Sequence, residues 1–381
     1  MAVTEPWLSP SQAAVGKALL AAASLLPCLP SGARAETAPT FTSVSYKYLD
    51  YLDFQPDAER VRVIANAVNV VSPINERWSF SAGAVTDAVS GASPRYYTNA
   101  LTKLEDYRRA QNISLTRWGS SGSVTLSHAR SAERDYISKS LGITGVWYVD
   151  DTKNTAVTAG LGAARDVIDV PARGVNNEGK SVNDFLLGVT QVLTRNDVGQ
   201  LIARYTTGHG YYTDPYKSID ERPRERSGYS ALVRWNHHFP SLESSVRSSY
   251  RWYQDSFGIR AHTLGFEYVQ PLANGRLVVT PLVRWYTQTA ANFYLPANPG
   301  RNGRTYPAED AVYYSQDQRL SAFGAQTLGI KSAIRVSGNT WFDIKYEGYK
   351  QRGQWALAGR SDASLAPFNA RSVQVGISTR F

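Results

Sequence analysis

The sequence predicts an all-β protein, a transmembrane antiparallel β-barrel of about sixteen strands, with fourteen or eighteen strands as the alternatives. Three observations predict it. From residue 41 onward, polar and apolar residues alternate in segments of roughly nine to fifteen residues, which is the side-chain period of a strand. Short and long connections join these segments in turn, as in a barrel whose strands reverse at two rims. The chain also has 23 Tyr and 9 Trp, which suit the aromatic belts of a membrane barrel.

The mean hydropathy of −0.33 is compatible with a membrane barrel, because each strand is apolar on only one face. A tyrosine-rich secreted β-sandwich is the alternative that this composition leaves open. No stretch reaches 18 apolar residues, so no transmembrane helix is predicted.

Residues 1–35 are predicted to be a signal peptide that is removed on export. Lys17 precedes the apolar run Ala18–Leu26, and Ala33–Ala35 offers a small-x-small cleavage pattern. The single cysteine, Cys28, lies in this segment, and Pro27 before it disfavours the alternative of a lipidated N-terminus. Residues 36–381 then form one barrel domain without cysteine, which excludes disulfides and thiolate metal sites.

The first strands illustrate the pattern. In Phe41–Asp50, Val44, Tyr46 and Tyr48 share one face and Lys47 lies on the other. In the second segment, residues 60–71, the apolar positions are Val61, Val63, Ala65 and Ala67, and the polar ones are Arg60, Arg62 and Asn66. The third segment is Arg77–Asp87, and thirteen more are centred on residues 114, 125, 144, 159, 188, 203, 233, 246, 265, 282, 329, 345 and 375.

The connections between these segments fall into two classes. Seven are short and rich in turn residues: 72–77, 119–122, 150–154, 194–197, 239–242, 270–276 and 337–340. Eight are mostly longer and polar: 51–59, 90–107, 131–136, 168–180, 209–226, 254–258, 290–318 and 351–368. An even number of strands places both chain ends at the rim of the short turns.

The last strand alternates to the chain end, with Val373, Val375, Ile377, Thr379 and Phe381 on one face. It resembles the closing strand of bacterial outer-membrane barrels, although Thr379 stands where those strands usually have a larger apolar residue. The resemblance implies a Gram-negative outer-membrane location and assembly-signal function for Phe381. Its implied partners are the barrel-assembly machinery, outer-membrane lipid and lipopolysaccharide.

In such a barrel the apolar face must contact lipid and the polar face must line the lumen. The residues expected to face lipid are Ile113, Leu115, Leu141, Ile143, Phe185, Leu187, Leu264, Phe266, Phe342 and Ile344. The cations expected to line the lumen and to set selectivity are Arg60, Arg62, Arg204, Arg234, Arg247, Arg251, Arg284, Lys331, Arg335 and Lys345. Fewer acids share this face, chiefly Asp184, Glu267, Asp343 and Glu347.

The net charge is +9, and +8 remains after residues 1–35 are removed. No basic run, zinc spacing or recognition helix accompanies this charge, so nucleic acid is not an expected partner. A basic lumen favours anions by raising their local concentration. The alternative is that these cations pair with inward and loop acids and stiffen the wall without conferring selectivity.

Catalytic and metal-binding motifs are absent from the sequence. None of the spacings of serine hydrolases, zinc proteases, nucleotide-binding loops or calcium loops occurs. The neighbours His237 and His238 point to opposite faces of a strand and cannot chelate one metal, and the same holds for Ser127 and His128 as a nucleophile and base. We expect no enzyme, cofactor or metal, although a hydrolase triad assembled from several strands is a distant alternative.

Three segments are unusually dense in polar and aromatic residues: Tyr46–Tyr51, Asp87–Pro94 and Tyr313–Ala325. Together they resemble an uncharacterised family of Gram-negative proteins with a domain of unknown function. The resemblance implies an outer-membrane barrel and, as an accessory role, export or electron transfer with a periplasmic redox protein. The motif residues expected at the extracellular rim are Asp87, Ser90, Gly91, Ser93, Pro94, Asp317 and Arg319. Asp87, Asp317 and Arg319 are predicted to form one polar cluster there, or else only ion pairs that anchor loops.

The function that the sequence favours is a pore or transporter for small anionic solutes. The solutes would diffuse through a basic lumen narrowed by the long loops Ala290–Gln318 and His209–Arg226. The alternative is a non-conducting barrel that acts as a scaffold or export accessory for a periplasmic partner.

Overall fold

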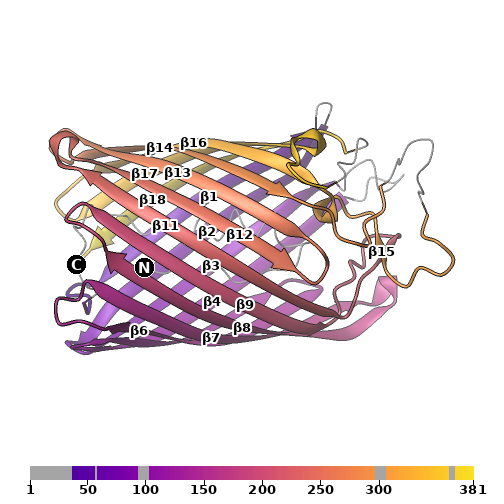
Figure 1. Ribbon diagram of the computed structural model, residues 1–381, viewed down its shortest axis with the longest axis horizontal. Helices are drawn as coiled ribbons and strands as arrows, with labels where there is room; N and C mark the ends of the chain where they lie inside the picture. Colours follow the sequence, from indigo (N-terminus) through magenta and orange to yellow (C-terminus); the bar gives the residue numbers. More distant parts are fainter. Residues whose placement is uncertain (1–36, 56–57, 93–102, 297–305, 360–364) are drawn as a thin grey trace.

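A computed structural model describes residues 37–55, 58–92, 103–296, 306–359 and 365–381. The signal peptide predicted for residues 1–35 lies outside them. Sixteen antiparallel strands form one closed barrel in which chain neighbours pair and β1 closes against β18 (Figure 1). This confirms the predicted strand number and excludes fourteen or eighteen. No helix among the described residues is long and apolar enough to cross a membrane.

The barrel strands are β1 (Ser43–Gln55), β2 (Ala58–Asn75), β3 (Trp78–Ala92), β4 (Lys103–Gly119), β5 (Gly122–Ala132), β6 (Tyr136–Tyr148), β7 (Thr155–Val170), β8 (Val175–Val192), β9 (Asp197–Gly210), β11 (Glu225–Phe239), β12 (Ser244–Asp255), β13 (Arg260–Leu272), β14 (Leu277–Gln288), β16 (Phe323–Arg335), β17 (Thr340–Arg352) and β18 (Phe368–Arg380). Two short strands in the loops, β10 (Asp220–Glu221) and β15 (Tyr314–Ser315), pair separately. Single-turn 3₁₀ helices occupy Pro171–Arg173 (η1), Pro240–Leu242 (η2), Gln318–Leu320 (η3) and Gly353–Trp355 (η4).

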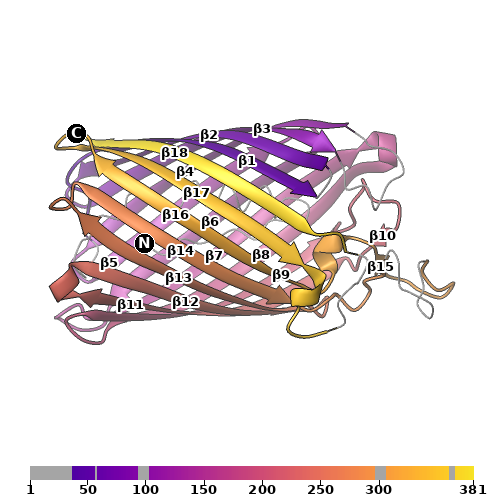
Figure 2. The ribbon, with the colours of Figure 1, turned by 90° about the horizontal axis from the view of Figure 1, so that it is seen from above.

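The two rims differ as predicted. The short turns and the C-terminus lie at one end of the barrel, and the loops that carry β10 and β15 lie at the other (Figures 1 and 2). We call these ends the turn rim and the loop rim. Several strands extend further toward the loop rim than predicted. β1 continues to Gln55 and β2 starts at Ala58, so most of the loop predicted at 51–59 is strand.

Exposure alternates along the strands and identifies the inner face. On β17, Trp341, Asp343 and Lys345 are buried, whereas Phe342 and Ile344 are exposed on the convex outer surface. All ten residues predicted to face lipid are exposed apolar side chains, which confirms the outward face of their strands. Cross-strand register then assigns the remaining strands, because direct partners in a sheet point to the same side.

The second strand departs from the predicted orientation. Val63 and Ala65 are 0% and 2% exposed and pair with the inward residues Tyr51 and Leu49. The apolar positions of this strand therefore face the lumen, and the prediction that they meet lipid is wrong. The strand has apolar residues on both faces, with Ile64 and Val68 exposed on the outside. The alternation of its sequence therefore could not show which face meets lipid.

The same strand contains a β-bulge that separates Arg60 from Arg62. The register shifts so that Asp53 pairs with Val61 and Phe54 with Glu59, which leaves Arg60 as the extra residue. Arg60 points inward, 3.9 Å from the Asp53 carboxylate. Arg62 points outward and binds Asp50 through two hydrogen bonds of 3.0 and 2.6 Å. Arg62 is therefore not a lumen residue, contrary to the prediction.

The turn between β4 and β5 supplies a test of the fold. Gly119 and Gly122 pair across this turn, but a Cβ added to Gly122 would overlap the Val146 carbonyl of β6, whereas one added to Gly119 would meet only ordinary contacts. We expect Gly122→Ala to destabilise the barrel by about 1–3 kcal/mol, the usual cost of overpacking. Gly119→Ala is the matched control. Urea unfolding in lipid vesicles measures both, and equal effects of the two changes would contradict the close approach of β6 to this turn.

Candidate functional site

The inner wall of the barrel carries most of the buried ionisable groups of the protein. Register places nine of the ten predicted cations there, all except Arg62: Arg60, Arg204, Arg234, Arg247, Arg251, Arg284, Lys331, Arg335 and Lys345. The predicted acids Asp184, Glu267, Asp343 and Glu347 share this face. The structure thus places these residues on the inner wall of the barrel, and their role in selectivity stays a prediction.

Four further inward cations were missed from the sequence: Lys47, Arg108, Lys180 and Arg226. Lys47 lies between the outward residues Tyr46 and Tyr48, so the alternation of this strand was sufficient to predict that Lys47 faces the lumen. The other three were missed because they lie next to or inside segments that the sequence assigned to loops.

Most of the inward cations are paired with inward carboxylates. The pairs are Lys47–Asp343 at 3.6 Å, Arg60–Asp53 at 3.9 Å, Arg108–Asp87 at 2.8 Å, Lys180–Asp166 at 3.0 Å, Arg204–Asp184 at 2.5 Å, Arg226–Asp255 at 2.6 Å, Arg247–Glu267 at 3.7 Å and Lys345–Glu347 at 3.0 Å. Several of these groups are almost completely buried, so each pair removes a charge that would otherwise be costly in the wall. The pairing with inward acids that the alternative interpretation expected is therefore present on this part of the wall, and its effect on stiffness and selectivity stays a prediction.

One side of the lumen differs. Within the described residues, Arg284 of β14 and Lys331 of β16 form no ion pair with a carboxylate, and Lys331 lies directly opposite another cation, Lys345. Arg335 of β16 lies 5.1 Å over the Trp341 ring. Arg234 of β11 donates to the Gln200 amide oxygen at 2.9 Å.

Small residues separate two of these cations along the wall. Register places Arg234, Ser249, Gly265 and Arg284 in one row across β11, β12, β13 and β14. With strands about 4.8 Å apart, the two arginine Cα atoms are about 14 Å from each other, and only a hydroxyl group and a glycine lie between them. We call Arg234, Arg284 and Lys331 the basic sector. It presents positive charge to the lumen next to a wall of short side chains.

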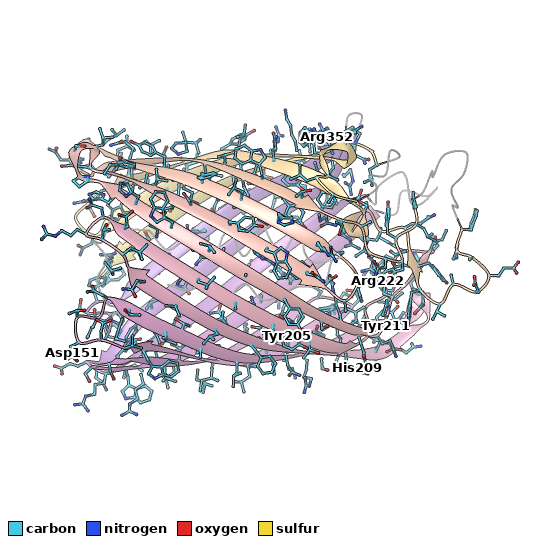
Figure 3. All side chains as sticks on the ribbon, viewed as in Figure 1. Asp151, Tyr205, His209, Tyr211, Arg222 and Arg352 are labelled. Carbon is cyan, nitrogen blue, oxygen red and sulfur yellow. The ribbon has the colours of Figure 1, made fainter. Side chains whose placement is uncertain are left out.

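Two long loops meet at the loop rim. The loop between β9 and β11 contributes β10, and the loop between β14 and β16 contributes β15, and these strands pair through Asp220–Ser315 and Glu221–Tyr314. These are the two loops predicted to narrow the lumen. Figure 3 shows Tyr211 and Arg222 of the first loop at this end and Asp151 at the turn rim.

A buried ionic cluster holds the two loops together. Arg222 is 2% exposed and donates to Asp220 at 3.0 Å and to Asp317 at 2.8 Å. Arg319 binds Asp317 and also Asp214, the latter at 2.6 Å. Burial alone would raise the pKa of the Asp317 carboxyl, but the charges of Arg319, Lys217 and Arg222 together hold it well below its usual range. Asp317 therefore remains ionised and bridges the loops.

The loops pack on inward-facing residues of the barrel. Gln288 of β14 donates to the carbonyl oxygens of Arg319 and Ser321 at 3.0 and 2.7 Å. Leu320 packs with Phe257 in an apolar cluster that Tyr212 joins. Because these partners lie at the inner edge of the rim, the loops cover part of the lumen mouth.

The predicted rim motif divides into separate parts. Asp87 lies in β3, is 1% exposed and binds Arg108 of the neighbouring strand. Asp317 and Arg319 instead bind each other, Arg222 and Asp214, so the single cluster predicted with Asp87 is wrong. Ser90 and Gly91 belong to the end of β3 rather than to a loop, and Ser93 and Pro94 lie outside the described residues.

A closed antiparallel barrel with an apolar outer face and a charged inner wall defines an outer-membrane β-barrel protein. Residues 100–372 match the family described as a protein of unknown function (DUF3570). The match covers more than half of the chain, so the chain belongs to this family.

Solved structures show the same fold. A bacterial polysaccharide outer membrane secretin is similar over 90% of this chain and 98% of its own, with a TM-score of 0.54 and 10% sequence identity. CdiB from Acinetobacter baumannii is similar over 87% of this chain and 60% of its own, with a TM-score of 0.51 and 11% identity. No curated protein matches the chain significantly. At these identities the likeness shows the fold alone, and the turn rim is the periplasmic end of such a barrel.

The ionic cluster of the loops supplies a second prediction. We expect Arg222→Ala to leave the buried Asp220 carboxylate without its arginine and to leave Asp317 with Arg319 as its remaining arginine. Breaking a buried ion pair typically costs about 3–5 kcal/mol, so the loops should be released from the rim. Limited proteolysis should then cleave between β9 and β11 much faster than in the unchanged protein.

Arg224→Ala is the matched control, because Arg224 is two residues away and its ion pair with Glu178 is about half exposed. An exposed pair contributes at most about 1 kcal/mol, so cleavage should change little. Similar cleavage rates in the two variants would mean that the buried cluster does not hold the loops.

Proposed function

We propose that the protein is an outer-membrane pore or transporter for small anionic solutes. The single observation that supports this most strongly is the basic sector, where Arg284 and Lys331 face the lumen with no carboxylate partner among the described residues. The ion pairs elsewhere on the wall neutralise each other, whereas Arg284 and Lys331 add positive charge to the field that a solute in the lumen experiences.

The expected size of this effect is modest. A unit charge about 7 Å from an anion in water contributes about 0.6 kcal/mol, or a roughly threefold higher local anion concentration. Salt screens this attraction beyond about 10 Å at 0.1 M, so the side chains act where the loops bring the solute close to the wall. A pore of this kind would select anions by raising their concentration in the lumen and not by binding them tightly, which suits transport by diffusion.

A second candidate function is a non-conducting scaffold or export barrel for a periplasmic partner, such as a redox protein. The observation that favours it is the packing of two loops over the lumen mouth. The similar solved structure is named a polysaccharide secretin, which makes export a reasonable activity to test for this chain as well.

A hydrolase is the third and least favoured candidate. His238 lies 3.2 Å from the Ser245 hydroxyl, but its neighbour His237 binds Asp197 on the opposite face of the strand. The described residues contain no cluster of three or more potential metal ligands. A lipase assay that loses its signal in Ser245→Ala would favour this candidate.

Planar bilayer recordings under a salt gradient test the proposal. The mature protein should conduct, with a reversal potential that shows preference for anions. In Arg284→Gln/Lys331→Gln the anion-to-cation permeability ratio should fall by about threefold or more, as the Coulomb energies above imply.

The control variant is Arg117→Gln/Lys350→Gln, which removes the same charge from the outer face of β4 and β17 and should leave the ratio unchanged. Preference for cations in the unchanged protein would overturn the role of the basic sector while keeping the pore. Absence of conductance would favour the scaffold or export barrel instead.

A further inference from the structure

Three cations lie side by side on the outer surface of the barrel. Arg130 of β5 pairs directly with Lys139 of β6, and Lys139 pairs directly with Arg165 of β7. All three are exposed, and each alternates with inward residues such as Ala129, Ser140 and Asp166. We call these three residues the outer cation row.

The outer cation row has no compensating acid within the described residues. Arg130 and Lys139 form no ion pair there, and Arg165 donates only to the neighbouring Ala164 carbonyl at 3.3 Å. Of the acids that follow on β7, Asp166 binds Lys180 inside the barrel and Asp169 accepts a hydrogen bond from the Asn177 backbone. Like charges directly opposite each other destabilise a sheet, so an anion from outside the protein would stabilise the row.

The position of the row indicates the source of that anion. β5 and β7 end at the loop rim and β6 begins there, so the row lies near the extracellular end of the wall. Toward the turn rim, the next outward residues are His128 on β5, Leu141 on β6 and Ala163 on β7. The exposed apolar side chains Leu126, Ile143 and Leu161 follow them on the same strands. The row therefore marks the level at which lipid headgroups meet the apolar belt.

An apolar depression of about 780 Å³ lies below the row on the same side of the barrel. Its outward lining includes Ile143, Leu161, Phe185 and Tyr205, and its floor contains small residues such as Ala203. Figure 3 shows Tyr205 on this wall, toward the loop end. A row of cations above an apolar depression matches an anionic amphiphile, whose charged group would contact the cations and whose apolar part would fill the depression.

The geometry points to a binding site for a phosphorylated, acylated glycolipid of the outer leaflet, which is lipopolysaccharide. Its phosphate groups bind the outer cation row and its acyl chains occupy the depression. A second copy of the chain fits less well, because a two-fold contact through this face would bring two cation rows together. The site lies outside the lumen and does not depend on the proposed transport function.

The test uses the mature protein in detergent, titrated with bisphosphorylated lipid A and followed by native mass spectrometry and thermal unfolding. The unchanged protein should retain lipid A and gain thermal stability from it. Arg130→Gln/Lys139→Gln/Arg165→Gln should bind lipid A about tenfold or more weakly, because three charge-assisted contacts are lost. Ala203→Phe, which fills the depression, should also weaken binding severalfold.

The control is Arg117→Gln/Arg260→Gln/Lys350→Gln, which removes the same charge from exposed outward positions on three separate strands and should bind as the unchanged protein does. Circular dichroism and heat-modifiable gel migration establish that each variant folds. Dephosphorylated lipid A should bind weakly, and inorganic pyrophosphate should neither bind comparably nor displace lipid A.

Three results would overturn the proposal. The first is unchanged lipid A affinity in the triple variant of the row. The second is equal affinity for lipid A and for either dephosphorylated lipid A or pyrophosphate, which would show an apolar or a plain phosphate site. The third is a lipid-free oligomer that excludes lipid A, which would assign this face to a second copy of the chain.

Discussion

Closure of the sheet between its first and last strands is the constraint on which the rest of this structure depends. In hydrocarbon no water satisfies a backbone N–H or C=O group, so every strand needs a partner on both sides. β1 and β18 meet this requirement over a continuous register from Ser43–Arg380 to Phe54–Asn369. Because the closed sheet has only an inner and an outer surface, every charged strand residue must be accommodated in the lumen or at the lipid boundary.

The charges inside and outside the barrel follow this division. On the inner wall, pairs such as Arg108–Asp87 and Lys180–Asp166 neutralise buried groups, whereas Arg284 and Lys331 face the lumen without a carboxylate partner among the described residues. On the outer wall, Arg130, Lys139 and Arg165 occur in one row with no acid between them. The unpaired cations of the inner wall face the water of the lumen, and those of the outer wall face the layer of lipid headgroups. In each case these surroundings can supply the counter-ion. The same electrostatic argument therefore supports two independent sites on opposite faces of one sheet.

The sequence predictions were correct where the information lay within a single strand, and they were wrong where it lay in the pairing with a neighbouring strand. Pairs such as Leu141 and Ile143 were correctly placed outside, because a period of two and polar neighbours suffice to orient a strand. Val63 and Ala65 were placed on the wrong face, because their strand is apolar on both sides and only the partner strand distinguishes them. Arg62 was misplaced for a related reason, since a bulge at Arg60 changes the alternation without leaving a mark in the sequence.

The sequence by itself determined the strand number, the two unlike rims and the apolar outer face, because these depend on alternation and turn chemistry within single segments. The tertiary structure decided which charges meet. Arg222 and Asp317 are 95 residues apart and form a buried bond, and Asp87 binds Arg108 instead of joining them. It also brought Arg130, Lys139 and Arg165 into one row, which is invisible until the strand register is known. The physical reason is that ion pairing acts across strands and between loops, where distance along the chain carries no information about distance in space.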